Sequence, residues 1–172
     1  NNKAGFADNK AANIGRTSAI PAAIIGTVIS GYLIDLIGDI IIKILATLIL
    51  IFVIERTINQ IRNNNTNSTD ISLLSRKKKE YMFGTAFAGL FSGMIGIGGG
   101  AILVTANRSI LQMDSNKAAG TSFLVAATIV PVALLSHIIL DGVTGNIIDN
   151  IGLLTIIIFP LTALISAFLG AK

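Results

Sequence analysis

The chain has 172 residues, of which 52% are hydrophobic and only 13% are charged, and its mean hydropathy is +0.77. This small number of polar side chains cannot cover the surface of a soluble globule of this length. The composition therefore argues against a soluble enzyme and indicates an integral membrane protein. The net charge of +4 then bears on orientation in the bilayer and not on nucleic acid, which we do not expect as a partner. Because cysteine is absent, disulfides and cysteine metal sites are excluded.

The chain has five apolar stretches, and several of them approach the ~20 residues that a helix needs to cross a ~30 Å hydrocarbon layer. In chain order they are 19–37, 40–54, 82–104, 122–140 and 151–171. None alternates polar and apolar residues as the strands of a membrane barrel do. The sequence therefore predicts an all-α fold, that of a polytopic helical membrane protein.

Basic residues give the expected orientation and the domain organisation. The polar stretch at 56–80 is rich in Lys and Arg, which predicts a cytoplasmic linker by the positive-inside bias. Its Asn-, Thr- and Ser-rich centre has too little apolar surface to fold, so we expect it to be flexible. The linker separates a first membrane repeat, of which 1–55 is the C-terminal part, from a second repeat at 81–172.

Residues 82–104 do not suit one straight span, because four glycines interrupt them in "GIGGG". The next polar stretch, 107–117, is again basic and is expected on the cytoplasmic side, so the chain must turn back at the glycines. Glycine permits positive φ and leaves backbone N–H groups accessible, and a helix that restarts at Gly100 directs its positive dipole end to the turn. The pattern predicts a glycine-tipped hairpin that binds a small anion. The site residues predicted at this tip are Gly96, Gly98, Gly99 and Gly100.

Thr121 and Ser122 extend the predicted anion site. They follow a glycine at the expected start of the next helix, where they would form a second helix terminus facing the first. The alternative for the glycines is close helix packing, because Gly89 and Gly93 have the GxxxG spacing, as do Gly96 and Gly100. We favour packing for Gly89 and Gly93, and the anion site for the glycines that follow.

Other polar residues predict little chemistry. His137 is expected near the external end of its helix, where a hydrogen bond at the interface is favoured over a role in relaying coupled protons. Arg16 marks the cytoplasmic side, and with Asn13 it is a candidate for lining a vestibule. One histidine allows no Ser/His/Asp set, and no paired carboxylates lie in an apolar stretch, so we expect no enzyme activity, no metal and no cofactor.

Two alignments suggest an internal repeat. Aligning the chain with itself at an offset of 139 residues pairs Pro21 with Pro160. In this alignment the second copy of the repeat crosses the membrane in the direction opposite to the first, as in the inverted repeats of many secondary transporters. The rival offset of 107 pairs "NKAA" at Asn9 with "NKAA" at Asn116. We favour 139, which also implies that a first glycine hairpin and a last helix are missing from this chain, and that the chain alone does not transport.

The segments "GLFSGMIGIGGGAILV" and "KAAGTSFLV" resemble a signature of the TauE/SafE sulfite exporter family, also called toluene-sulfonate uptake permeases. "AGFADNKAANIGRTSAIPAAIIGTVISGYL" is similar to a segment of that family's first repeat. The resemblance implies a multi-pass carrier in the cell membrane that moves sulfite, a sulfonate or a related organosulfur anion, with glycine-broken hairpins and inverted repeats.

The chain departs from this family pattern just after the glycine hairpin. Where family members tend to have proline, this chain continues with Thr105, Ala106, Asn107 and Arg108. Asn107 and Arg108 are therefore further candidates for anion binding, since a guanidinium suits oxyanions, although a cytoplasmic anchor is slightly favoured for Arg108. The function expected is alternating-access transport of a small anion. An anion channel, or a membrane-embedded assembly protein whose glycines serve packing alone, is the alternative.

Overall fold

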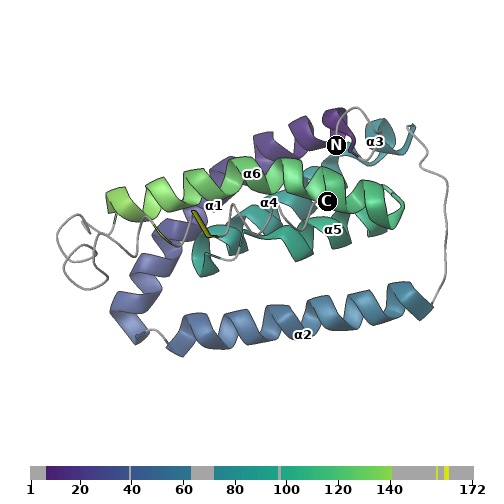
Figure 1. Ribbon diagram of the computed structural model, residues 1–172. Helices are drawn as coiled ribbons and strands as arrows, with labels where there is room; N and C mark the ends of the chain where they lie inside the picture. Colours follow the sequence, from purple (N-terminus) through teal and green to yellow (C-terminus); the bar gives the residue numbers. More distant parts are fainter. Residues whose placement is uncertain are drawn as a thin grey trace. The chain divides into compact units, whose positions relative to one another are not determined.

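The computed structural model describes residues 7–38, 40–62, 72–96 and 98–140, and the single positions 158, 161 and 162. These residues form six helices: α1 (Asn9–Ile37), α2 (Ile40–Arg62), α3 (Ser72–Arg76), α4 (Lys78–Ile95), α5 (Gly100–Ser109) and α6 (Ser115–Leu140) (Figure 1). The described ranges contain no strand, which confirms the predicted all-α fold.

The chain divides into two compact units, Asn1–His137 and Ile138–Lys172. Of the second unit the structure describes the last residues of α6 and three helical positions, so the predicted span at 151–171 and Pro160 lie mostly outside the described residues. The description that follows concerns the first unit.

Two described helices, α1 and α6, are long and apolar enough to cross a membrane. With 29 and 26 residues they extend over roughly 40 Å each, more than the ~30 Å of a hydrocarbon core. Large apolar side chains point outward from the bundle; Leu36 is 81% exposed and Phe123 is 75% exposed. Such surfaces are unfavourable in water and suit lipid, so the helices belong in a bilayer.

The helix α2 runs back along the bundle in the direction opposite to α1 (Figure 1). It ends at Arg62, two turns beyond the predicted end of its apolar stretch at 54. Hydropathy marks what lipid covers, but Glu, Arg and Gln are good helix formers and continue the helix into the polar region. The predicted linker at 56–80 is therefore helical at both ends, and its Asn-rich centre at 63–71 lies outside the described residues.

The helices α1 and α4 pack closely and in parallel along a seam of small residues. A Cβ atom at Gly89 would overlap the backbone of Ala19, and one at Gly93 would overlap the backbone of Ala23. The contacts keep the same order along both helices, so both helices begin at the same end of the bundle. The packing interpretation of Gly89 and Gly93 is confirmed.

The helices α4 and α5 form the predicted hairpin. The turn between them brings Gly99 against Ala88 of α4, and the later residue Asn107 of α5 bonds to Tyr81 near the start of α4. The two helices are therefore antiparallel, and the chain returns to the end at which α4 began. With ten residues, α5 spans only ~15 Å, about half of a hydrocarbon core.

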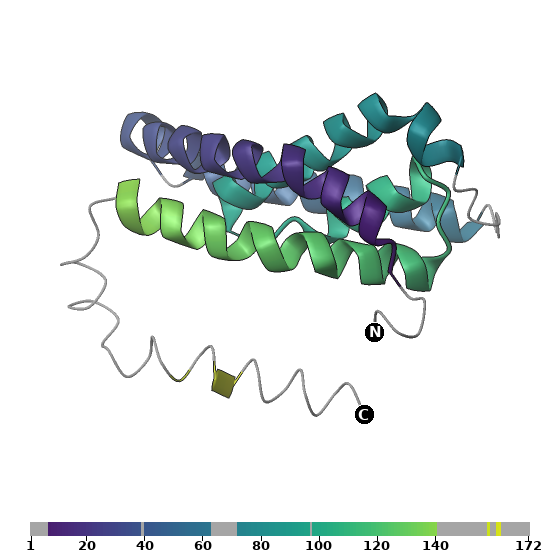
Figure 2. The same cartoon turned by 90° about the horizontal axis from the view of Figure 1, so that it is seen from above.

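The helix α6 lies alongside α1 and runs in the same direction (Figure 2). Near the start of both helices, the backbone N–H of Asp8 donates to the hydroxyl of Thr121 over 2.9 Å. Further along, the guanidinium of Arg16 donates to the carbonyl oxygen of Leu124. The starts of α1, α4 and α6 thus share one end of the bundle, as the charge pattern predicts.

The two "NKAA" segments begin equivalent helices. The carboxylate of Asp8 accepts hydrogen bonds from the backbone of the first turn of α1, and Asp114 does the same for α6 through the N–H of Lys117. The offset of 107 therefore pairs two helices with the same kind of start and the same direction. The favoured offset of 139 pairs α1 with 151–171, so the inverted repeat stays a prediction.

Candidate functional site

Three of the glycines between α4 and α5 have backbone conformations that side chains disfavour. Gly96 ends α4 with φ of 78°, Gly98 has φ of 78°, and Gly99 precedes α5 with φ of 61°. A residue with a Cβ atom costs about 1–2 kcal/mol in the left-handed region, whereas glycine adopts it freely. The glycine cluster is therefore a tight turn and not a packing surface of a continuous helix.

This glycine turn, Gly96 to Gly99, folds back into the bundle. Gly98 and Gly99 are buried. A Cβ atom at Gly99 would lie 2.6 Å from the carbonyl oxygen of Ala88, and one at Gly98 would lie 3.0 Å from the side chain of Val130 on α6. Gly96 and Gly100, by contrast, have open space where a Cβ atom would be. The turn is thus wedged between α4 and α6, and it places the N-cap residue of α5 inside the protein.

The first turn of α5 suits a negative charge. Gly99 is its N-cap residue and has no side chain, so no side chain caps the first backbone N–H groups. A helix start with free N–H groups carries about half a positive charge. Because its N-cap residue Gly99 is buried while Gly100 is only partly covered, this helix start is both favourable for a small anion and within its reach.

Ser92 is a candidate site residue that the sequence reasoning missed. Its side chain is 1% exposed, and its Oγ atom has no hydrogen-bond partner within the described structure. It shares one face of α4 with Tyr81 and Thr85, whose hydroxyl groups do have partners. The available sequence signal was this spacing of hydroxyl side chains along an otherwise apolar helix.

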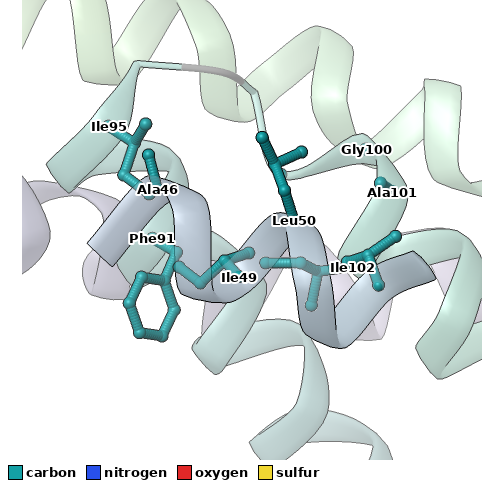
Figure 3. Close-up of a pocket in the computed structure, with 10 residues that line it drawn as sticks. Ala46, Ile49, Leu50, Phe91, Ile95, Gly100, Ala101 and Ile102 are labelled. Atoms are coloured by element: carbon teal, nitrogen blue, oxygen red, sulfur yellow. The ribbon is translucent and has the colours of Figure 1, made fainter. Parts of the chain in front are cut away.

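A small groove lies between the glycine turn and α2 (Figure 3). Its volume is about 50 Å³, whereas one buried water needs roughly 10–15 Å³. The residues that line it are Ala46, Ile49, Leu50, Val53, Phe91, Ile95, Gly99, Gly100, Ala101 and Ile102. Apolar side chains of α2 therefore cover the glycine turn on this side, and the groove offers no polar side chain to an anion.

Asn107 and Ser122, two predicted binding residues, are engaged in a closed network. Asn107 is fully buried; its Oδ1 atom accepts from the hydroxyl of Tyr81 over 2.9 Å, and its Nδ2 atom donates to Ser122 and to the carbonyl of Ala118. The hydroxyl of Ser122 also donates to Ala118. These bonds join α4, α5 and α6, so the network positions the hairpin against α6.

Thr121 does not begin a helix that faces the glycine turn. The helix α6 already begins at Ser115, because Asp114 provides its cap, so Thr121 and Ser122 lie within it. The prediction of a second helix terminus at these residues is therefore wrong. The hydroxyl of Thr121 instead accepts the backbone N–H of Asp8.

The two arginines on α5 and α1 have different surroundings. Arg108 lies near the end of α5, about 12 Å along the helix from the glycine turn, and it is half-buried without a hydrogen bond or ion pair to the described residues. Arg16 donates from Nε and Nη2 to the carbonyl of Leu124 over 3.2 and 2.7 Å, and from Nη1 to Asn13. Arg16 thus connects α1 to α6, beyond marking one end of the bundle.

Basic side chains gather at the end where α1, α4 and α6 begin. Lys10, Asn13 and Lys78 line an open pocket there, together with residues of α3. Lys117 at the start of α6 lies 4.0 Å from the carboxylate of Asp8. This end attracts anions, and by the positive-inside bias it remains the predicted cytoplasmic end.

His137 makes the hydrogen bond that the sequence analysis favoured. Its Nε2 atom lies 2.8 Å from the carbonyl oxygen of Gly93, near the end of α4. A helix end has carbonyl groups without intrahelical partners, and His137 satisfies one of them. The role in proton coupling stays a prediction.

The chain matches one known family over nearly its whole length. The model of the family described as "Sulfite exporter TauE/SafE" matches residues 6–172. The match includes the glycine turn and all six described helices. No curated protein and no solved structure matches the chain.

Proposed function

Because the chain belongs to the sulfite exporter TauE/SafE family, we propose that it acts as a secondary transporter that moves a small sulfur oxyanion across the cell membrane by alternating access. The family is one of membrane transporters and not of enzymes, and its description gives an anion as the transported species. The choice of anion and the mechanism are our proposal.

The observation that carries this proposal is the buried glycine turn at the start of α5. It directs uncapped backbone N–H groups and a positive helix dipole into the bundle, at a place where only glycine fits both the backbone angles and the packing. Broken helices with such ends are a recurrent way to bind anions within membrane transporters.

The packing around the turn supports a small substrate. Gly98 and Gly99 are buried against α6 and α4, and the adjoining groove of about 50 Å³ is lined by apolar residues, so the turn itself leaves little room beside its backbone N–H groups. We therefore propose sulfite, or a similarly small oxyanion, in preference to an aryl sulfonate.

The contacts between α1 and α6 support alternating access. At the basic end, Asp8 bonds to Thr121 and lies near Lys117, and Arg16 holds the carbonyl of Leu124. Apolar side chains of the two helices also share one core cluster, so these polar contacts lie at one end of a packed interface. Polar contacts of this kind are expected to break when one part of a transporter rocks against another. They form a gate on the basic side of the glycine turn.

The test is transport of radiolabelled sulfite by the full-length protein in liposomes. We expect saturable uptake and counterflow, since counterflow separates a carrier from a channel. Gly100→Val adds bulk at the start of α5 where a Cβ atom has open space, so the variant is expected to fold but to lose uptake. The control, Thr47→Val, changes an exposed position on α2 and is expected to transport normally. Absence of saturable flux refutes the function, and full activity of Gly100→Val refutes the location.

A further inference from the structure

We propose that the hydroxyl group of Ser92 donates a hydrogen bond directly to the transported oxyanion, at a subsite formed by Ser92 and the glycine turn. The inference deepens the proposed function and rests on it for the identity of the anion.

The first argument is that the Ser92 hydroxyl has no partner. A buried hydroxyl without a hydrogen bond is unfavourable, and buried polar groups in folded proteins are nearly always satisfied. Other buried hydroxyls of the described helices follow this rule; Thr27 and Ser122, for example, donate to the carbonyl four residues earlier. Ser92 is the exception, with 1% exposure and no bond at Oγ.

The second argument is that the local acceptor for Ser92 is already covered. The carbonyl four residues before Ser92 belongs to Ala88, and Gly99 packs directly onto that oxygen. The Ser92 hydroxyl makes no hydrogen bond to this carbonyl. A buried donor that leaves its local acceptor unused is available to a ligand.

The third argument is position. The Cβ atom of Ser92 lies 3.3 Å from the place of a Cβ atom on Gly99, which is the N-cap residue of α5. The Ser92 side chain of α4 and the N-cap residue of α5 are therefore close neighbours, so one small ligand is within reach of donors from both elements. Donors of both kinds, together with the positive end of a helix dipole, are complementary to an oxyanion.

The experiment compares wild-type full-length protein with Ser92→Ala, using sulfite as the probe. Thermal stability in detergent is measured with and without sulfite, and sulfite uptake is measured in liposomes. Without sulfite, Ser92→Ala is expected to be at least as stable as wild type, because it removes an unsatisfied group and no hydrogen bond. We expect its stabilisation by sulfite to be lost and its KM for uptake to rise at least tenfold.

A matched control is Ser18→Ala on α1. The hydroxyl of Ser18 lies 2.7 Å from that of Thr85 and also donates to the carbonyl of Gly15. Its removal is expected to lower thermal stability and to leave the response to sulfite unchanged. The control therefore separates the loss of a structural hydroxyl from the loss of a ligand.

The possible results distinguish the two proposals. If Ser92→Ala responds to sulfite as wild type does, the subsite is refuted and the transport function stands. If wild type is stabilised by sulfite, Ser92→Ala is not, and neither shows flux, the subsite stands and the transport proposal fails. If sulfite neither stabilises nor crosses with the wild-type protein, both proposals are overturned.

Discussion

Replacing Asn107 with alanine tests whether this residue holds the hairpin in place or binds the substrate. The change removes the acceptor of the Tyr81 hydroxyl and the two bonds that Nδ2 donates to Ala118 and Ser122. The orphaned hydroxyl of Tyr81, which is fully buried, costs about 1–3 kcal/mol. The two lost interhelical bonds add about 0.6 kcal/mol each in a membrane protein. We therefore expect Asn107→Ala to lower the free energy of unfolding by about 2–4 kcal/mol.

The assay is equilibrium unfolding in mixed micelles, titrated with a denaturing detergent. Tyr81→Phe and the double variant complete a double-mutant cycle. The losses in free energy of unfolding of the two single variants are expected to add up to about 1–2 kcal/mol more than the loss of the double variant, because both single changes remove the same hydrogen bond. Additive effects, or a loss below about 0.5 kcal/mol, would refute the network as we describe it.

Transport measurements decide the functional part of the same prediction. Once uptake is corrected for the folded fraction, the KM of Asn107→Ala for sulfite is expected to equal that of wild type, since the hydrogen bonds of Asn107 are all made within the protein. A KM raised tenfold would return Asn107 to the binding site.

Two further predictions concern helix contacts. Gly93→Ala is expected to destabilise the protein by about 1–3 kcal/mol, because its Cβ atom would overlap the backbone of α1. Gly84→Ala is expected to cost much less, since its Cβ atom would meet the flexible end of Ile110 at 3.0 Å and make an ordinary contact with Ala106. Thermal unfolding of the two variants checks the difference. Arg16→Lys loses the two hydrogen bonds that Arg16 donates to the carbonyl of Leu124, so it is expected to weaken the contact of α1 with α6. Limited proteolysis at the basic end of the bundle is then expected to be faster than in wild type. An unchanged rate of proteolysis would contradict the gate.

Much of the fold was predictable because it depends on local properties of the chain. The hydrophobic stretches predicted the helices of a membrane protein, since lipid requires every backbone group to be paired within a segment. The glycine cluster after Ile95 predicted a hairpin, because it contradicts a straight helix and basic residues follow it. The GxxxG spacing of Gly89 and Gly93 predicted close packing, although not that α1 would be the partner.

The candidate site was only partly predictable, because hydrogen-bond partners lie far apart in the chain. Asn107 and Ser122 are polar residues next to the hairpin, and only the fold shows that their groups are engaged with Tyr81 and with each other. The helix start at Ser115 depends on the cap by Asp114, which hydropathy does not register.

By itself the sequence determined the class of protein, the positions of most helices and the turn at the glycines, since each follows from composition and spacing. Only the tertiary structure decided which polar groups are satisfied. Arg16 finds its acceptor 108 residues away, at Leu124, while the hydroxyl of Ser92 is buried without a partner where Gly99 packs against α4. Whether a buried donor is free for a ligand depends on such long-range contacts, and one helix alone does not specify them.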